Sequence, residues 1–197
     1  MRKSPGKKPT EHNGSGQLRI IGGEWRSRQF SFPMAQGLRP TPNRVRETLF
    51  NWLGQTLTGW RVLDAFAGSG ALGFEAASRE AAEVVLVERD ARLVAGLRAS
   101  VQRLKATTLT VHAADALVWM KAAPRGAFDL VMLDPPFAAD LFDAALAAAM
   151  PLVGEGGLIY VEAPREIPAP AGFFVLRQGR AGAVHYQLLR REDNPAS

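Results

Sequence analysis

Short apolar segments alternate with longer amphipathic segments from residue 60 towards the end of the chain. The short segments predict strands, and the longer ones predict helices because their apolar residues recur every three or four positions. A regular alternation of strands and helices is typical of a doubly wound α/β fold, in which helices cover both faces of a parallel sheet. The predicted strands are 61–65, 83–88, 108–112, 128–134 and 157–162.

The clearest predicted helix spans 90–105 and has Asp90 as its N-cap. A second, alanine-rich helix is expected over 141–150. The glycines of 154–157 predict a turn. Two more strands with glycines between them predict a closing antiparallel hairpin, and these are 173–177 and 184–190.

A different pattern precedes the sheet. Residues 18–32 predict a β-hairpin in which Gly22 and Gly23 separate the two strands. Thr41 and Pro42 have the sequence of a helix start, with the threonine as N-cap and the proline at the first helical position. We therefore expect a hairpin and a helix in front of the sheet domain.

The chain of 197 residues suits one main domain with a small appendage. Its beginning is polar and rich in lysine, proline, glycine and serine, which predicts a disordered basic tail. In chain order we expect this tail, the hairpin-and-helix extension, the sheet domain and a C-terminal tail, which are 1–17, 18–58, 59–191 and 192–197.

Composition limits the classes of function. Hydrophobic residues make up 47% of the chain, as in a globular protein, and the absence of cysteine rules out disulfides and thiolate chemistry. No apolar run is long enough for a membrane span and no signal-peptide pattern is present, so we expect a cytoplasmic protein. The three histidines lack the spacing of metal ligands, and the net charge of +5 favours a polyanionic partner.

Asp134, Pro135, Pro136 and Phe137 follow the apolar run 128–133. They stand at the carboxyl end of a predicted buried strand, where open α/β sheets bind ligands. The prolines stiffen the backbone and donate no hydrogen bond, so the carbonyl groups of Asp134 and Pro135 stay free as acceptors. Two acceptors beside an aromatic ring suit a planar base that is held by its exocyclic amine. Taken alone, the same residues fit a strand end that turns into a helix equally well.

A second motif lies at the first strand-to-helix turn and begins with Asp64. Its glycines let a ligand approach the backbone at a helix start. A dinucleotide would place its pyrophosphate beside Asp64, and one such repulsion at ~4 Å costs about 4 kcal/mol at an effective dielectric of 20. S-adenosylmethionine carries an ammonium and a sulfonium group and no phosphate, so Asp64 favours it as the cofactor. The other candidate cofactor-binding residues of this loop are Phe66, Ala67, Gly68, Ser69 and Gly70.

Two further acids follow later strands. Glu88 ends the next strand, about twenty residues past the glycines, where an acid binds the diol of a ribose. Nucleotide cofactors share this feature, so Glu88 indicates a nucleoside without choosing among them. Asp115 follows the third strand, and it either accepts a hydrogen bond from the adenine amine or caps the next helix.

Five arginines in front of the sheet domain are candidates for contact with nucleic acid. Arg26 and Arg28 lie in the predicted second strand of the hairpin, where residues two apart share one face. Arg44 and Arg46 lie in the first turn of the predicted helix, where the dipole disfavours cations by about 0.3–1 kcal/mol each. Together with Arg39 they predict a phosphate-binding surface, and the alternative is a solvated basic face.

The combination of these motifs resembles the class I methyltransferases that modify exocyclic amines of nucleobases. The flanking segments narrow the resemblance to the RsmD family, bacterial guanine-N2 methyltransferases of small-subunit ribosomal RNA. The similarity runs from about residue 15 to residue 191. The segments that carry it are Ile20-Ile21-Gly22-Gly23-Glu24-Trp25-Arg26, Gly37-Leu38-Arg39-Pro40-Thr41, Arg44-Val45-Arg46-Glu47-Thr48-Leu49-Phe50-Asn51-Trp52-Leu53 and Phe66-Ala67-Gly68-Ser69-Gly70-Ala71-Leu72-Gly73.

This resemblance implies a Rossmann-like methyltransferase sheet with a reversed last strand and S-adenosylmethionine as methyl donor. It implies one guanine of 16S ribosomal RNA as the acceptor, within the assembled small ribosomal subunit. Asp134, Pro135 and Phe137 would form the catalytic site. We expect a monomer that uses no metal and binds no membrane.

Three other functions fit parts of the pattern. A methyltransferase for adenine N6 or cytosine N4 in DNA or another RNA also uses Asp-Pro-Pro-aromatic, but the DNA enzymes need a target-recognition insertion for which this chain has no room. A non-catalytic RNA-binding module would not need both motifs intact. A dinucleotide oxidoreductase conflicts with Asp64.

Overall fold

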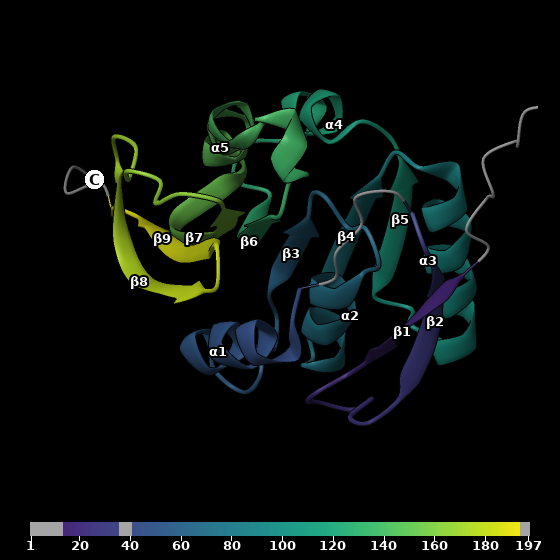
Figure 1. The fold of residues 1–197 in the computed structure, drawn as a ribbon. Coiled ribbons are helices and arrows are strands. Elements are labelled where there is room, and N and C mark those ends of the chain that lie inside the picture. Colours follow the sequence, from purple (N-terminus) through teal and green to yellow (C-terminus); the bar gives the residue numbers. More distant parts are fainter. Residues whose placement is uncertain (1–13, 36–40, 194–197) are drawn as a thin grey trace, which may run out of the picture.

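The centre of the protein is a mixed sheet. This computed structural model describes residues 14–35 and 41–193. Within them, seven strands follow the order β5-β4-β3-β6-β7-β9-β8 (Figure 1). The strands of the sheet are β3 (Arg61–Asp64), β4 (Glu83–Glu88), β5 (Leu109–Ala113), β6 (Phe128–Leu133), β7 (Val153–Ala163), β8 (Phe173–Ala181) and β9 (Val184–Arg191).

The pairing of the strands confirms the predicted fold class. Strands β3 to β7 pair in parallel. Strand β9 runs antiparallel to both of its neighbours, β7 and β8. The reversed last strand and the closing antiparallel hairpin are therefore present. Because the chain leaves β5 and places β6 on the other side of β3, the strand order reverses between β3 and β6, which is where such sheets bind ligands.

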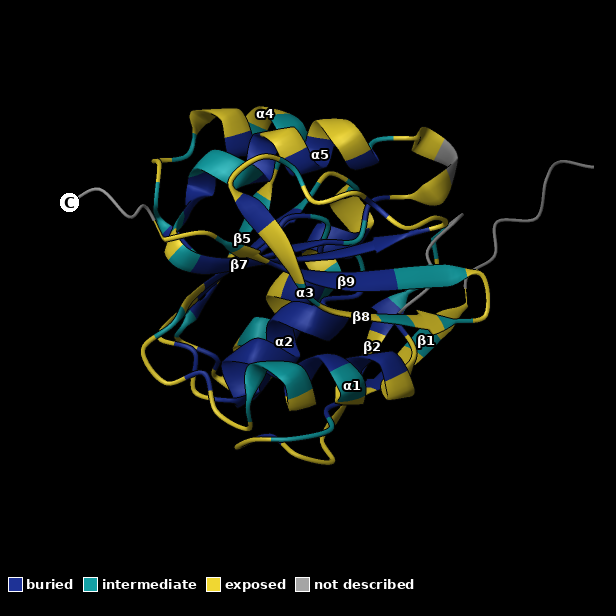
Figure 2. Ribbon diagram, turned by 90° about the vertical axis from the view of Figure 1, so that its left-hand side faces the viewer, coloured by how far each residue is buried: buried dark blue, intermediate teal, exposed yellow. Residues whose placement is uncertain are grey.

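Helices cover both faces of the sheet (Figure 2). The buried residues form two hydrophobic clusters. Three helices contribute to one cluster, and two contribute to the second. The first group is α1 (Asn43–Leu53), α2 (Ala71–Ser78) and α3 (Ala91–Leu104), and the second is α4 (Ala116–Ala122) and α5 (Phe142–Ala149). Two short 3-10 turns, η1 (Phe137–Ala139) and η2 (Met150–Leu152), flank α5. None of the helices in the described parts of the chain has the length and apolarity that crossing a membrane requires.

The local sequence pattern was sufficient to predict helix α3. Asp90 caps it and accepts hydrogen bonds from the amides of Arg92 and Leu93 at 2.8 and 3.4 Å, as predicted. Its apolar residues Leu93 and Leu97 are buried, and Leu97 packs in the core cluster on this face of the sheet. At its end Lys105 adopts a left-handed conformation with a φ of 53°, which stops the helix.

The N-terminal hairpin forms a separate two-stranded sheet, β1 (Ser15–Arg19) and β2 (Gln29–Pro33). Strand β1 thus begins three residues inside the predicted tail, while residues 1–13 and 194–197 lie outside the described residues. The hairpin packs beside α3 and α2 (Figure 1), and the rings of Phe30 and Phe74 lie 4.6 Å apart.

The second strand of this hairpin is shorter than predicted. Residues 24–27 form a turn, in which Trp25 is buried and its amide donates to the Ser78 hydroxyl at 2.9 Å. Arg26 therefore lies in this turn and Arg28 directly after it, outside both strands, so the prediction that they share a strand face is wrong. The contact with Ser78 at the end of α2 sets the backbone conformation of this segment, whereas the sequence alone predicted a longer strand.

The predicted turn at 154–157 lies inside β7. Strand β6 pairs Phe128 with Val153 and then Leu130 with Leu158, so the segment between them bulges out of the ladder. Gly156 has a φ of 66°, a left-handed conformation that glycine adopts without strain. The glycines thus mark a break in register within one strand.

Candidate active site

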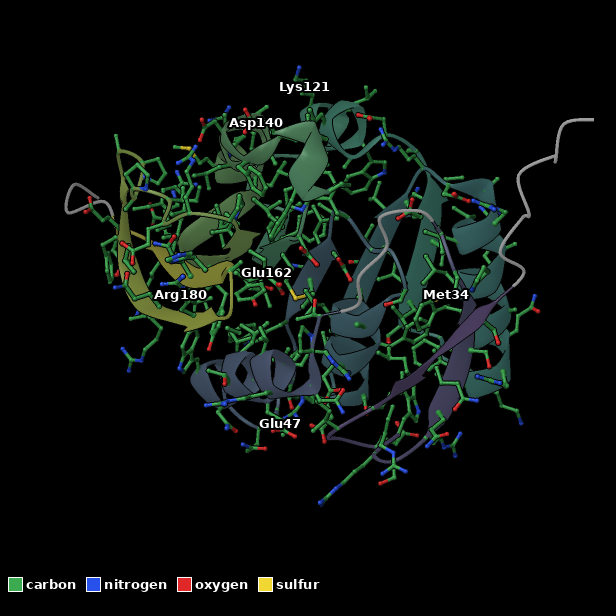
Figure 3. All side chains as sticks on the ribbon, in the orientation of Figure 1. Met34, Glu47, Lys121, Asp140, Glu162 and Arg180 are labelled. Carbon is green, nitrogen blue, oxygen red and sulfur yellow. The ribbon has the colours of Figure 1, made fainter. Side chains whose placement is uncertain are left out.

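Three acids meet at the carboxyl ends of β3, β6 and β7. The sheet pairs Asp64 with Met132, and Met132 with Tyr160. Two residues further along these strands stand Asp134 and Glu162, on the same face because strand side chains alternate. This face is the one that α1 and α2 cover, and Figure 3 shows Glu162 near the middle of the molecule above α1.

Burial dominates the electrostatics of these acids. It raises the pKa of Asp64 to about 7 and the pKa of Glu162 to about 7. Burial and then the charges of Glu162 and Asp64 raise the pKa of Asp134 well above its usual range. The hydroxyl of Tyr160 donates to Glu162 Oε1 at 3.0 Å, which lowers the pKa of Glu162 and opposes the effect of its burial.

Glu162 was not among the predicted site residues. The sequence carries one signal for it, because an acid at the end of an otherwise apolar strand is unusual. Glu162 lies near Asp134 because β6 pairs with β7, and no local sequence pattern predicts that pairing.

Thr41 has a different partner from the one predicted. Its buried hydroxyl donates to Asp134 Oδ2 at 3.4 Å. Helix α1 begins after Pro42 without a side-chain cap, so the prediction that Thr41 is its N-cap is wrong. The threonine instead connects the start of α1 to the acid at the end of β6.

The segment after β6 presents an aromatic ring to solvent. Phe137 starts the 3-10 turn η1, and its side chain is 40% exposed. One edge of the ring packs on Phe142, at 5.6 Å between centroids. Pro135 is buried and Pro136 is exposed. The predicted arrangement of an acid followed by an accessible aromatic ring is thus present in the structure.

The glycine loop is held between two acids. The amide of Gly73 donates to the buried Asp64 Oδ2 at 2.9 Å, so Asp64 fixes the start of α2. The amide of Gly68 donates to Glu88 Oε2 at 2.9 Å. Gly70 has a φ of 81°, and a Cβ there would lie 2.6 Å from the Phe74 ring, so only glycine fits.

The remaining predicted cofactor-binding residues differ in exposure. Phe66 is half-buried, whereas Ala67 and Ser69 are buried within the loop. Asp115 caps α4, because its Oδ1 accepts from the Val118 amide at 3.1 Å. The capping interpretation of Asp115 therefore holds, and its exposed carboxylate keeps a second oxygen for a ligand.

The predicted basic surface is smaller than the sequence suggested. Arg26, Arg28 and Arg44 are exposed, but Arg39 lies outside the described residues. Arg46 is completely buried, so the prediction that it contacts RNA is wrong. Helix α1 turns Arg46 inwards while Arg44, two residues earlier, faces solvent.

Arg46 belongs to a buried ion-pair network that centres on Glu75 of α2. The Glu75 carboxylate pairs with Arg46 at 3.4 Å and with Arg79 at 3.0 Å. It also accepts from the amides of Ile21 and Gly22, at 2.9 and 2.8 Å. Burial lowers the pKa of Arg46, and the charge of Glu75 opposes this. This network joins the hairpin, α1 and α2, and thereby fixes the N-terminal extension on the sheet domain.

The strand order and the site at its point of reversal define a class I methyltransferase fold. The solved precorrin-6y C5,15-methyltransferase of Geobacter metallireducens has this fold too, with a TM-score of 0.63 at 16% identity over 82% of this chain and 94% of that one. The solved Escherichia coli protein yhhF superposes with a TM-score of 0.81 at 41% identity and covers 91% of this chain and 100% of that one.

Sequence comparison identifies the family. Residues 18–190 match the family described as "Conserved hypothetical protein 95". The Escherichia coli protein named "Ribosomal RNA small subunit methyltransferase D" is 43% identical over 94% of this chain and 96% of its own length. The chain belongs to this family, RsmD, as the sequence motifs predicted.

Proposed function

We propose that this protein transfers a methyl group from S-adenosylmethionine to the N2 amine of one guanine in 16S ribosomal RNA. The observation that carries the proposal is the position of Asp134 and the exposed Phe137 ring at the strand-order reversal, next to the loop held by Glu88. Family membership supports the RNA substrate, since the Escherichia coli relative is named for the small-subunit RNA.

The loop residues fit the proposed cofactor. Glu88 lies at the rim of the loop, where its carboxylate can accept from ribose hydroxyls as it accepts from Gly68 here. Segment 64–70 contains one acid, Asp64, and no cation, which suits a positively charged ligand. When bound, S-adenosylmethionine supplies a methyl group from its sulfonium centre, and the electron pair of the broken bond stays on sulfur.

The residues after β6 would hold the acceptor. The amine of guanine donates one hydrogen bond to the Asp134 carboxylate and the other to the Pro135 carbonyl, which turns the nitrogen lone pair out of conjugation. The Phe137 ring stacks on the base, which contributes about 1–3 kcal/mol and offsets the cost of extracting it from the RNA. Asp134 takes the proton once the methylated nitrogen is cationic.

The RNA would reach this site over the N-terminal extension. Arg26, Arg28 and Arg44 are the exposed cations that remain of the predicted surface. The Glu75 network joins the hairpin and α1, so these cations would meet the phosphates at defined positions. We further propose that the substrate is the assembled small subunit, that the protein acts as a monomer in the cytoplasm, and that no metal takes part.

The decisive experiment is methylation with labelled S-adenosylmethionine of small subunits prepared without the modification. Mapping should place the label on N2 of a single guanine, and free 16S RNA should accept less label than the subunit. Label on an adenine or cytosine amine would refute the guanine assignment. A thermal-shift assay with S-adenosylhomocysteine and NAD checks the cofactor separately, because only the former should stabilise the protein.

A further inference from the structure

Glu162 is a buried acid that stands beside the proposed catalytic aspartate. Glu162 is 4% exposed, and Leu158, Ile159 and Val161 before it in β7 are buried apolar residues. A carboxylate in such a position is costly to ionise unless cations or hydrogen bonds compensate. The shift of its pKa comes from burial, opposed by hydrogen bonds of Tyr160 and Thr41. Packing alone would favour an apolar residue here, so the acid calls for a functional explanation.

The sheet places the two carboxyl groups next to each other. Because Met132 pairs with Tyr160, Asp134 and Glu162 follow on adjacent parallel strands, about 4.8 Å apart in such sheets, and on the same face. The Thr41 hydroxyl lies against both acids, since it donates to Asp134 Oδ2 at 3.4 Å and also lowers the pKa of Glu162. The Thr41 hydroxyl thus donates to Asp134 and also influences the pKa of Glu162.

Two carboxyl groups in such an environment do not ionise independently. The first loses its proton at moderate pH, and its charge then holds the proton of the second. Among the described residues, the other titratable groups that face the pair are Asp64 on β3, Tyr160 on β7 and Tyr186, which pairs with Glu162 from β9. Asp64 is an acid and raises the pKa of Asp134 further. The pair behaves in this respect like the two aspartates that share one proton in aspartic proteases.

On the basis of the proposed methyl transfer, we propose that Glu162 is a positioning residue that acts through Asp134: the two carboxyl groups hold one proton between them, and the charge of Glu162 makes Asp134 a stronger base. Before transfer both carboxyl groups of the reactive form are ionised. After transfer, the N–H bond of the cationic amine breaks, its electron pair stays on nitrogen, and the proton forms an O–H bond with Asp134, where it is the one proton that the pair holds. The Glu162 charge stabilises this protonated Asp134. Glu162 itself does not contact the base.

The test combines a direct titration with a rate measurement. In the free protein, the Asp134 carboxyl is followed by carbon-13 NMR in the wild type and in Glu162→Gln. Removal of the neighbouring charge should lower the midpoint of Asp134 by about 1 pH unit or more. The acidic limb of the single-turnover methylation rate should move to lower pH by the same amount, and the plateau rate should fall by less than about 10-fold because Asp134 becomes a weaker base.

Two further variants make the result specific. Glu166→Gln is the matched control, because the Glu166 side chain is 67% exposed and neighbours His185 instead of the acids, and it should change neither measurement. Tyr160→Phe removes the hydroxyl that favours ionised Glu162, so the proton shifts towards Glu162 and the Asp134 midpoint falls by a smaller amount. This second variant keeps both acids and tests the idea if Glu162→Gln folds poorly.

The outcomes separate this inference from the proposed function. An Asp134 midpoint that does not move in either variant would overturn the sharing of the proton. A midpoint that moves without a matching shift of the rate profile would overturn the role of Glu162 in the reaction. If the midpoint moves but the wild type itself methylates no guanine, the carboxyl pair stands and the proposed function falls.

Discussion

Removal of the Glu75 carboxylate should destabilise the protein more than removal of any other buried charged side chain among the described residues. Glu75→Ala leaves the guanidinium of Arg46 without its ion-pair partner. Both side chains are fully buried, so the charge of Arg46 stays buried after the substitution. Breaking a buried pair by removing one member costs about 3–5 kcal/mol. Two backbone amides, those of Ile21 and Gly22, lose their acceptor at the same time.

These losses are not additive, because all of them concern one carboxylate. We therefore expect the free energy of unfolding to fall by about 3–5 kcal/mol, which corresponds to about 6–20 °C in Tm for a chain of this size. The measurement is denaturant unfolding together with hydrogen exchange. The amides of Ile21 and Gly22 should lose protection before the amides of the central sheet do, since the hairpin is released first.

Glu47→Ala is the matched control for this experiment. Glu47 lies on the exposed side of α1, as Figure 3 shows, and its charge acts on Arg46 without a direct ion pair. Its removal should change the free energy of unfolding by less than about 0.5 kcal/mol. In a double-mutant cycle, Arg46→Met should restore part of the stability of Glu75→Ala, because it removes the unpaired charge. A loss below 1 kcal/mol in Glu75→Ala, or simple additivity in the cycle, would refute the reasoning.

Four further predictions concern the site. Asp134→Ala should keep cofactor and RNA binding but lower the single-turnover rate by about 100-fold or more, and Asp134→Asn should be milder, whereas a near-normal rate in Asp134→Ala would show that the motif only shapes a turn. Phe137→Ala should weaken productive binding of the RNA by about 1–3 kcal/mol, and Phe137→Leu should lose less, so equal effects would argue against stacking. Glu88→Ala should weaken S-adenosylhomocysteine binding by about 1.5–3 kcal/mol in calorimetry, and unchanged affinity with an intact fold would disprove the ribose contact. Charge reversal at Arg26, Arg28 and Arg44 should flatten the salt dependence of RNA binding and leave cofactor affinity unchanged, and a slope as steep as in the wild type would place the RNA elsewhere.

Several features were predictable because they depend on residues close together in the chain. A run of apolar residues between turns is enough to identify β4 or β6, since a strand buried on both faces needs no polar residues. The Asp90 cap is a contact within one helical turn, so its sequence pattern contains both partners. The glycine loop and the Asp-Pro-Pro-Phe segment were found for the same reason, as each lies directly after a recognisable strand.

Other features depend on which distant segments pack together. Thr41 and Asp134 are in contact although 93 residues separate them, and a cap pattern alone assigned the threonine to the wrong partner. Arg44 and Arg46 are both arginines in the same helical turn, yet Arg44 is exposed and Arg46 is buried against Glu75. Helical periodicity places them on different faces, but only the docking of the hairpin and α2 decides which face is buried.

The sequence by itself determined the fold class, the family and the two motifs of the proposed site, because these follow from local hydrophobic patterns and short segments. The tertiary structure alone decided the chemistry around Asp134. The pairing of β6 with β7 brings Glu162 beside it, and the burial of both acids shifts their pKa values. Desolvation and the repulsion between like charges depend on distances across the fold, and neighbouring positions in a chain do not contain that information.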